Sequence, residues 1–167
     1  MNTKTVTLSF RRDELLHDIA QVAFVEGDVM RVQEEHDRHQ VMDVVQDGNV
    51  ERVTRMLDVA FALVVEMCYP YSKVPIADKS SLDDEYKERQ AYVMPLWLPD
   101  DFSQTTVVVL LRLIHEFMVA KVLYDWLSIT KPDAAAAWKM KMDDAERDVR
   151  TNLHSRIGAV RRPMRPF

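Results

Sequence analysis

Glycine and cysteine are scarce in this sequence of 167 residues. Three glycines occur, at positions 27, 48 and 158, where average usage of about 7% would give several more. This scarcity argues against a sheet-rich fold with many tight turns, and the familiar glycine-rich phosphate-binding loops are missing. The single cysteine, Cys68, allows no intramolecular disulfide, so we expect a small buried hydrophobe in a reducing compartment.

A long uninterrupted apolar run is also missing. The most hydrophobic segment, residues 107–127, is broken by Arg112, Glu116, Lys121 and Asp125, whose charges would be costly in a bilayer. The first residues lack the apolar stretch of a signal peptide. With 47% apolar and 29% charged residues, the composition is that of a globular protein, and we expect a soluble product made in the cytoplasm.

The spacing of the apolar residues predicts a mostly α-helical fold, a bundle of about five helices. Apolar positions recur every three or four residues, as in a helix that buries one face. The expected helices cover residues 12–27, 28–46, 50–67, 103–129 and 132–153. The fourth is apolar on nearly every side, so we expect it to be the buried axis of the bundle, with Leu113 and Phe117 in the core.

Several residues at the expected helix starts favour capping. Asn49 is expected to cap the third helix, and Ser103 or Asp101 the fourth. Thr130 fits a capping box with the acidic residue three positions later, and Pro132 falls in the first turn of the fifth helix, where a missing N–H costs nothing. These signals define the starts of the last three helices.

Two short segments alternate with the two-residue period of a half-buried strand. In the first, Val6, Leu8 and Phe10 share one face. The second covers residues 91–99, where Pro95 restricts the segment to an edge position. We therefore expect a minor two-stranded β element beside the helices.

Two histidine-containing segments are candidate sites. His36 and His39 lie one helical turn apart and could share a metal ion, but we favour a polar helix surface or hydrogen bonds at a helix crossing as their explanation. His115 and Glu116 in the apolar fourth helix could form a buried acid–base pair, or the histidine could bond a neighbouring carboxylate or carbonyl. No serine or cysteine stands in a recognisable nucleophile motif. We therefore expect neither enzymatic activity nor a cofactor.

The chain ends in a basic segment, residues 156–167, with four arginines, two prolines and no acidic residue, on a protein of formal net charge −5. We expect an extended arm that follows a single helical domain, residues 1–155, because proline disfavours a helix and guanidinium groups suit carboxylates on a neighbour. The acidic run at residues 83–85 is a candidate docking site. A frayed end is the alternative, and the acidic body disfavours direct nucleic-acid binding. The interface residues expected in the arm are Arg156, Arg161, Arg162, Met164, Arg165 and Phe167.

From Leu98 to Phe167 the sequence combines a Leu-Pro start, a long apolar helix, an amphipathic helix and an arginine-rich end. This layout resembles the small helical head–tail connector, or adaptor, proteins of tailed phages and prophages. The resemblance implies a structural protein of the virion, assembled in the host cytoplasm as a homo-oligomeric ring next to the portal, with portal or tail proteins as partners and no membrane contact. It also implies that the arm contacts neighbouring subunits. The alternative is a helical-bundle protein with a metal or small-molecule site around His36 and His39.

Overall fold

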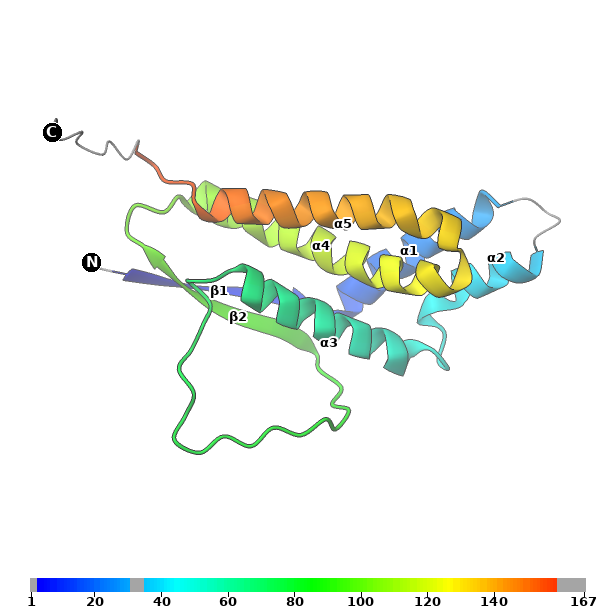
Figure 1. Ribbon diagram of the computed structural model, residues 1–167, viewed down its shortest axis with the longest axis horizontal. Coiled ribbons are helices and arrows are strands. Elements are labelled where there is room, and N and C mark those ends of the chain that lie inside the picture. Colours follow the sequence, from blue (N-terminus) through cyan, green and yellow to red (C-terminus); the bar gives the residue numbers. More distant parts are fainter. Residues whose placement is uncertain (1–2, 31–34, 159–167) are drawn as a thin grey trace, which may run out of the picture.

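The computed structural model describes residues 3–30 and 35–158, which form a mostly helical fold with a minor β element (Figure 1). This confirms the predicted fold class. In chain order the elements are β1 (Thr3–Arg11), α1 (Arg12–Asp28), α2 (Glu35–Met42), the short 3-10 helix η2 (Asp43–Val45), α3 (Val50–Met67), β2 (Ala91–Pro99), α4 (Gln104–Thr130) and α5 (Pro132–Leu153).

Helix α4 is the axis around which the other helices pack, as predicted. It runs side by side with α5 in Figure 1 and also contacts α1, α2 and α3. Phe117, Met118 and Leu123 are buried at its centre. Leu113 was expected in this core but is only partly buried, because it faces a groove between α1 and α5.

The strands β1 and β2 form an antiparallel ribbon in which Thr3 pairs with Pro99 and Arg11 with Ala91. Alternate side chains of β2 are buried, as the two-residue period predicted. Pro95 lies on the exposed face opposite Thr7. Because a two-stranded ribbon consists only of edge strands, it tolerates a proline in this position.

The second helix is shorter than predicted. A continuous helix was expected over residues 28–46, whereas α1 ends at Asp28, α2 covers Glu35–Met42, and a 3-10 turn follows. Gly27 explains part of this arrangement, because a Cβ added there would lie 2.6 Å from the Cγ of Met42. The missing side chain allows α2 to cross close to the end of α1, where Arg38 donates a hydrogen bond to the Gly27 carbonyl at 3.1 Å.

One of the two predictions for the caps of α3 and α4 is correct. The hydroxyl of Ser103 accepts a hydrogen bond from the backbone N–H of Thr105 at 3.2 Å and so caps α4. Asn49 does precede α3, but its side chain does not cap the helix. Its amide donates instead to the carbonyl of Asp43 at 2.8 Å, which fastens the turn before α3.

The predicted capping box at Thr130 is wrong. Thr130 is the last residue of α4, and its hydroxyl donates to the carbonyl of Trp126 at 3.1 Å. Lys131 separates the two helices, without a side-chain cap, and Pro132 begins α5 as predicted. The long helix therefore uses the threonine for its own last turn, in competition with the cap.

Candidate interaction surfaces

Arg156, three residues beyond the end of α5, packs against the body of the protein. Its guanidinium donates to the Tyr71 hydroxyl at 2.5 Å and to two carbonyls of the preceding turn at 2.7 and 3.1 Å. It also lies 3.5 Å from a carboxylate oxygen of Asp101 and 5.3 Å from the centre of the Phe102 ring. With 17% of its side chain exposed, Arg156 is an anchor that fixes where the chain leaves the bundle.

The anchor shifts the start of the basic arm. The sequence-based boundary puts Arg156 and Ile157 in the arm, whereas both contact the body, and the Ile157 N–H donates to the carbonyl of Asp101 at 3.0 Å. The other arm residues expected at an interface lie outside the described residues: Arg161, Arg162, Met164, Arg165 and Phe167.

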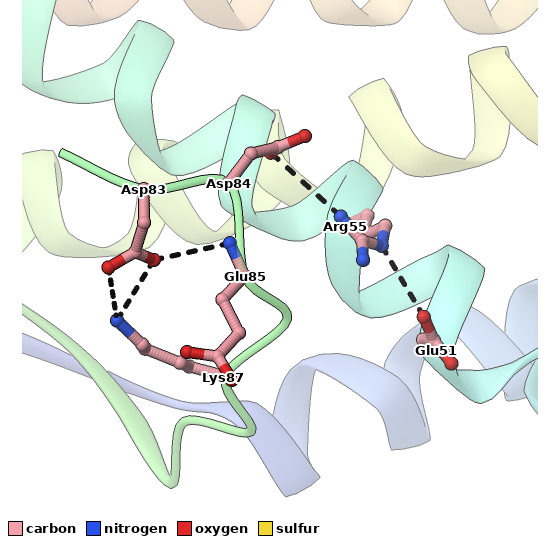
Figure 2. Close-up of polar contacts among 6 residues, drawn as sticks. All are labelled: Glu51, Arg55, Asp83, Asp84, Glu85 and Lys87. Carbon is pink, nitrogen blue, oxygen red and sulfur yellow. Dashed lines mark hydrogen bonds and ion pairs between the residues drawn. The ribbon is translucent and has the colours of Figure 1, made fainter.

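The acidic run lies in the long irregular segment between α3 and β2, which loops away from the bundle in Figure 1. Figure 2 shows Asp83 accepting from the Lys87 ammonium at 3.1 and 3.2 Å and from the Glu85 N–H at 3.2 Å. One of the three carboxylates predicted to receive the arm is therefore already neutralised within the loop.

The second carboxylate of the run points toward α3. Asp84 lies 4.0 Å from a guanidinium nitrogen of Arg55, whose Nε is 3.5 Å from Glu51 (Figure 2). The same guanidinium is 5.6 Å from the centre of the Tyr86 ring. These contacts join one part of the loop to Arg55 on α3, and each is exposed and contributes little alone.

A polar cluster fastens the end of this loop to the bundle. Arg12, at the start of α1, donates to Glu88 at 2.6 Å and to Thr54 at 3.2 Å. Beneath them Tyr92 is buried, and this burial, reinforced by the nearby Asp58 carboxylate, raises the pKa of the Tyr92 phenol above its ordinary value. The cluster of Arg12, Glu88 and Thr54 thus attaches the end of the loop to α1 and α3.

Two of the three candidate histidines, His115 and His36, have ordinary structural partners, and His39 is exposed on α2. The Nε2 of His115 lies 2.7 Å from a carboxylate oxygen of Asp18 on α1, so of the two alternatives the structure shows the bond to a neighbouring carboxylate and not a pair with Glu116. His36 contacts Gln40 on the exposed surface of α2. Within the described ranges, no group of three histidine, cysteine, aspartate or glutamate side chains is placed to hold a metal ion.

A groove of about 460 Å³ between α1, α4 and α5 was not anticipated from the sequence. Its walls carry acidic side chains from all three helices, and apolar residues, Trp138 and three further polar side chains complete the lining. The lining comprises Asp18, Gln21, Val22, Leu113, His115, Glu116, Val119, Ala120, Trp138, Lys141, Asp144, Ala145 and Asp148. The three helices are far apart in sequence, so the groove exists only after they pack.

The comparisons with known proteins identify no relative. The chain matches no protein-family model, no curated protein and no solved structure. Among the residues that the structure describes, no helix combines the length and hydrophobicity needed to cross a membrane.

Proposed function

We propose that this chain is a structural subunit of a larger assembly, and specifically a head–tail connector of a tailed phage or prophage. In this proposal the subunits form a ring next to the portal, and the C-terminal arm contacts a neighbouring subunit. The observation that carries the proposal is the Arg156 anchor, which gives a basic arm a fixed exit from a rigid bundle.

A fixed exit favours binding for an energetic reason. Because Arg156 and Ile157 are held by the body, the residues that follow leave from a defined point, and less freedom is lost when they dock. The arm beyond them supplies Arg161, Arg162 and Phe167. Arginine and aromatic side chains carry much of the binding energy at protein interfaces, and guanidinium groups pair well with carboxylates.

The titratable groups that the structure describes support a structural role. Burial raises the pKa of the Cys68 thiol to about 12, against an opposing effect of Arg150, so the thiol is not a nucleophile at neutral pH. Tyr92 is kept neutral in the same way. His115 is bonded to Asp18 between two helices, an arrangement that orients the helices.

Copurification tests this proposal. The chain should be coexpressed with the products of its neighbouring genes, among which the proposal requires a portal protein. We expect a stable complex that contains the portal ring and several copies of this chain per ring. A neighbourhood without virion genes, together with a chain that copurifies with none of its neighbours, would contradict the proposal.

A further inference from the structure

We infer that the groove between α1, α4 and α5 receives residues 159–167 of a second copy of the chain. This inference rests on the proposed function, because it identifies the surface on which the arm of one subunit docks. It also replaces the acidic run at residues 83–85, which the sequence had suggested for this role. Three features of the groove support it: its charge, its apolar floor and a fixed aromatic ring.

The charge of the groove is opposite to that of the arm. Asp18, Glu116, Asp144 and Asp148 line it, against the single ammonium of Lys141. Two of these carboxylates are shared with a neighbouring arginine on α5, at 2.8 Å from Asp144 and 3.7 Å from Asp148. Asp18 has one oxygen bonded to His115.

Glu116 is the carboxylate that remains most available. In the part of the chain that the structure describes it makes no ion pair, and it is exposed beside the groove. An arginine that enters the groove can therefore bind Glu116 without breaking an existing contact.

The apolar floor suits the remaining residues of the arm. Val22 from α1, Val119 from α4 and Ala145 from α5 contribute to it. The arm alternates arginines with apolar residues, among them Met164 and Phe167. A groove with acidic walls and an apolar floor therefore matches both kinds of side chain in the arm, whereas Leu82 beside the acidic run is 95% exposed and offers no such floor.

Trp138 provides a site for a cation at one end of the groove. Its indole N–H donates to Glu26 on α1 at 3.0 Å, which fixes the ring. The Lys141 ammonium lies 3.8 Å from the centre of that ring. Lys141 thus occupies the ring face, and because a guanidinium stacks on an indole at least as well as an ammonium does, an arginine of the arm would replace Lys141 there.

The position of the anchor favours a neighbour's groove over the chain's own. Arg156 is held by Tyr71, which follows α3 and accepts a hydrogen bond from the Trp97 N–H of β2 at 2.9 Å. The anchor therefore faces α3 and β2, whereas the groove opens between α1 and α5. The nine residues beyond Gly158 can extend up to about 30 Å, which is long enough to leave the body of the chain.

Disulfide trapping tests the inference directly on full-length chains. One chain carries Gln21→Cys in the groove, and a second, distinguishable by a tag, carries Met164→Cys in the arm. The two are mixed and oxidised with copper phenanthroline and air, which accept the two electrons lost by the thiols. We expect a disulfide-linked heterodimer on a non-reducing gel. Cys68 is buried and present in every sample, so it does not affect the comparison.

The matched control places the cysteine in the acidic run. Leu82→Cys, mixed with the same Met164→Cys chain, should give much less heterodimer, although Leu82 is 95% exposed and therefore open to oxidation. Equal or greater trapping at Leu82 would overturn the inference. A second outcome would also overturn it: no heterodimer from the mixed chains, together with an internal disulfide in a chain that carries both Gln21→Cys and Met164→Cys. In that case the arm would bind the groove of its own chain.

A charge exchange separates this inference from the proposed function. A groove variant, Glu116→Lys with Asp148→Lys, and an arm variant, Arg161→Glu with Arg162→Glu, should each weaken self-association about tenfold or more. Mixing the two variants should restore self-association, because the acidic arm of one chain then meets the basic groove of the other, and the basic arm meets the acidic groove. Loss with the arm variant but not with the groove variant would overturn the inference and leave the proposed function standing. A chain that self-associates through its groove but joins no virion would support the inference and contradict the proposed function.

Discussion

The guanidinium of Arg156 donates a hydrogen bond to the hydroxyl of Tyr71, 85 positions earlier in the chain, at a distance of 2.5 Å. This bond joins the end of α5 to the segment that follows α3. It also divides the basic segment in two. The anchor belongs to the folded body, and the residues after Gly158 are those left to contact another subunit.

The anchor should therefore contribute to stability. Arg156→Ala removes several hydrogen bonds and the contact with the Phe102 ring, which should lower the free energy of unfolding by about 1–3 kcal/mol. Arg147→Ala is the matched control, because that side chain is 67% exposed and its ion pairs should contribute less than about 0.5 kcal/mol. Urea denaturation measures both, and equal small losses would contradict the anchor.

The buried axis can be tested within α4. Phe117 is 2% exposed, so Phe117→Ala should cost about 3–5 kcal/mol through lost burial and the cavity that remains. Leu113→Ala should cost less, because Leu113 faces the groove. Glu146→Ala on the outer surface of α5 should cost under about 0.5 kcal/mol. Thermal unfolding that ranks the three variants in any other order would argue against this packing.

Stability should fall at alkaline pH partly through Cys68. Burial raises the pKa of its thiol to about 12, whereas in the unfolded chain it titrates near 8.5. A raised folded-state pKa gives stability that is complete below about pH 8.5 and is lost at up to about 1.4 kcal/mol per pH unit as the pH rises toward the folded value. The free-energy gap between the natural protein and Cys68→Ala should therefore narrow from pH 8 to pH 10.5. A constant gap would show that the thiol titrates normally.

His36 and His39 are predicted to bind no structural metal. A structural metal contributes directly to folding, so its removal would lower the melting temperature. We expect a chelator to leave the melting curve of the dialysed protein unchanged. Stoichiometric zinc, iron or manganese that survives dialysis, and is lost in a His36→Ala variant, would establish the metal site instead.

The ribbon and the buried helix were predictable because their signals are local. The alternation of Leu8 and Phe10 and the near-continuous apolar surface of α4 each lie within one element. The prediction of a continuous second helix failed where α2 crosses close to Gly27, a contact between elements. The prediction of a cap at Thr130 failed where two local preferences competed. At Thr130 the hydroxyl had a carbonyl of its own helix within reach, and sequence spacing does not decide between that carbonyl and a cap.

The contacts of the candidate surfaces were not predictable, because they join residues far apart in the chain. The sequence assigned Arg156 to a free arm, because its partners Tyr71 and Asp101 lie in other segments of the chain. The same holds for the groove, where Asp18 and Glu116 meet only after α1 packs on α4. A weak signal did exist, because Trp138 and Lys141 lie one turn apart on this amphipathic helix.

The central claim is that residues 159–167 serve assembly and not folding, and the most direct test is the mass in solution of two chains. Sedimentation velocity should be recorded for the full chain and for a chain that ends at Gly158, with circular dichroism and melting curves for both. We predict a closed oligomer for the full chain and a folded monomer, with nearly unchanged helix content and melting temperature, for the shortened one. An oligomer of the same size from the shortened chain, or a full chain that stays monomeric at every concentration, would contradict the account.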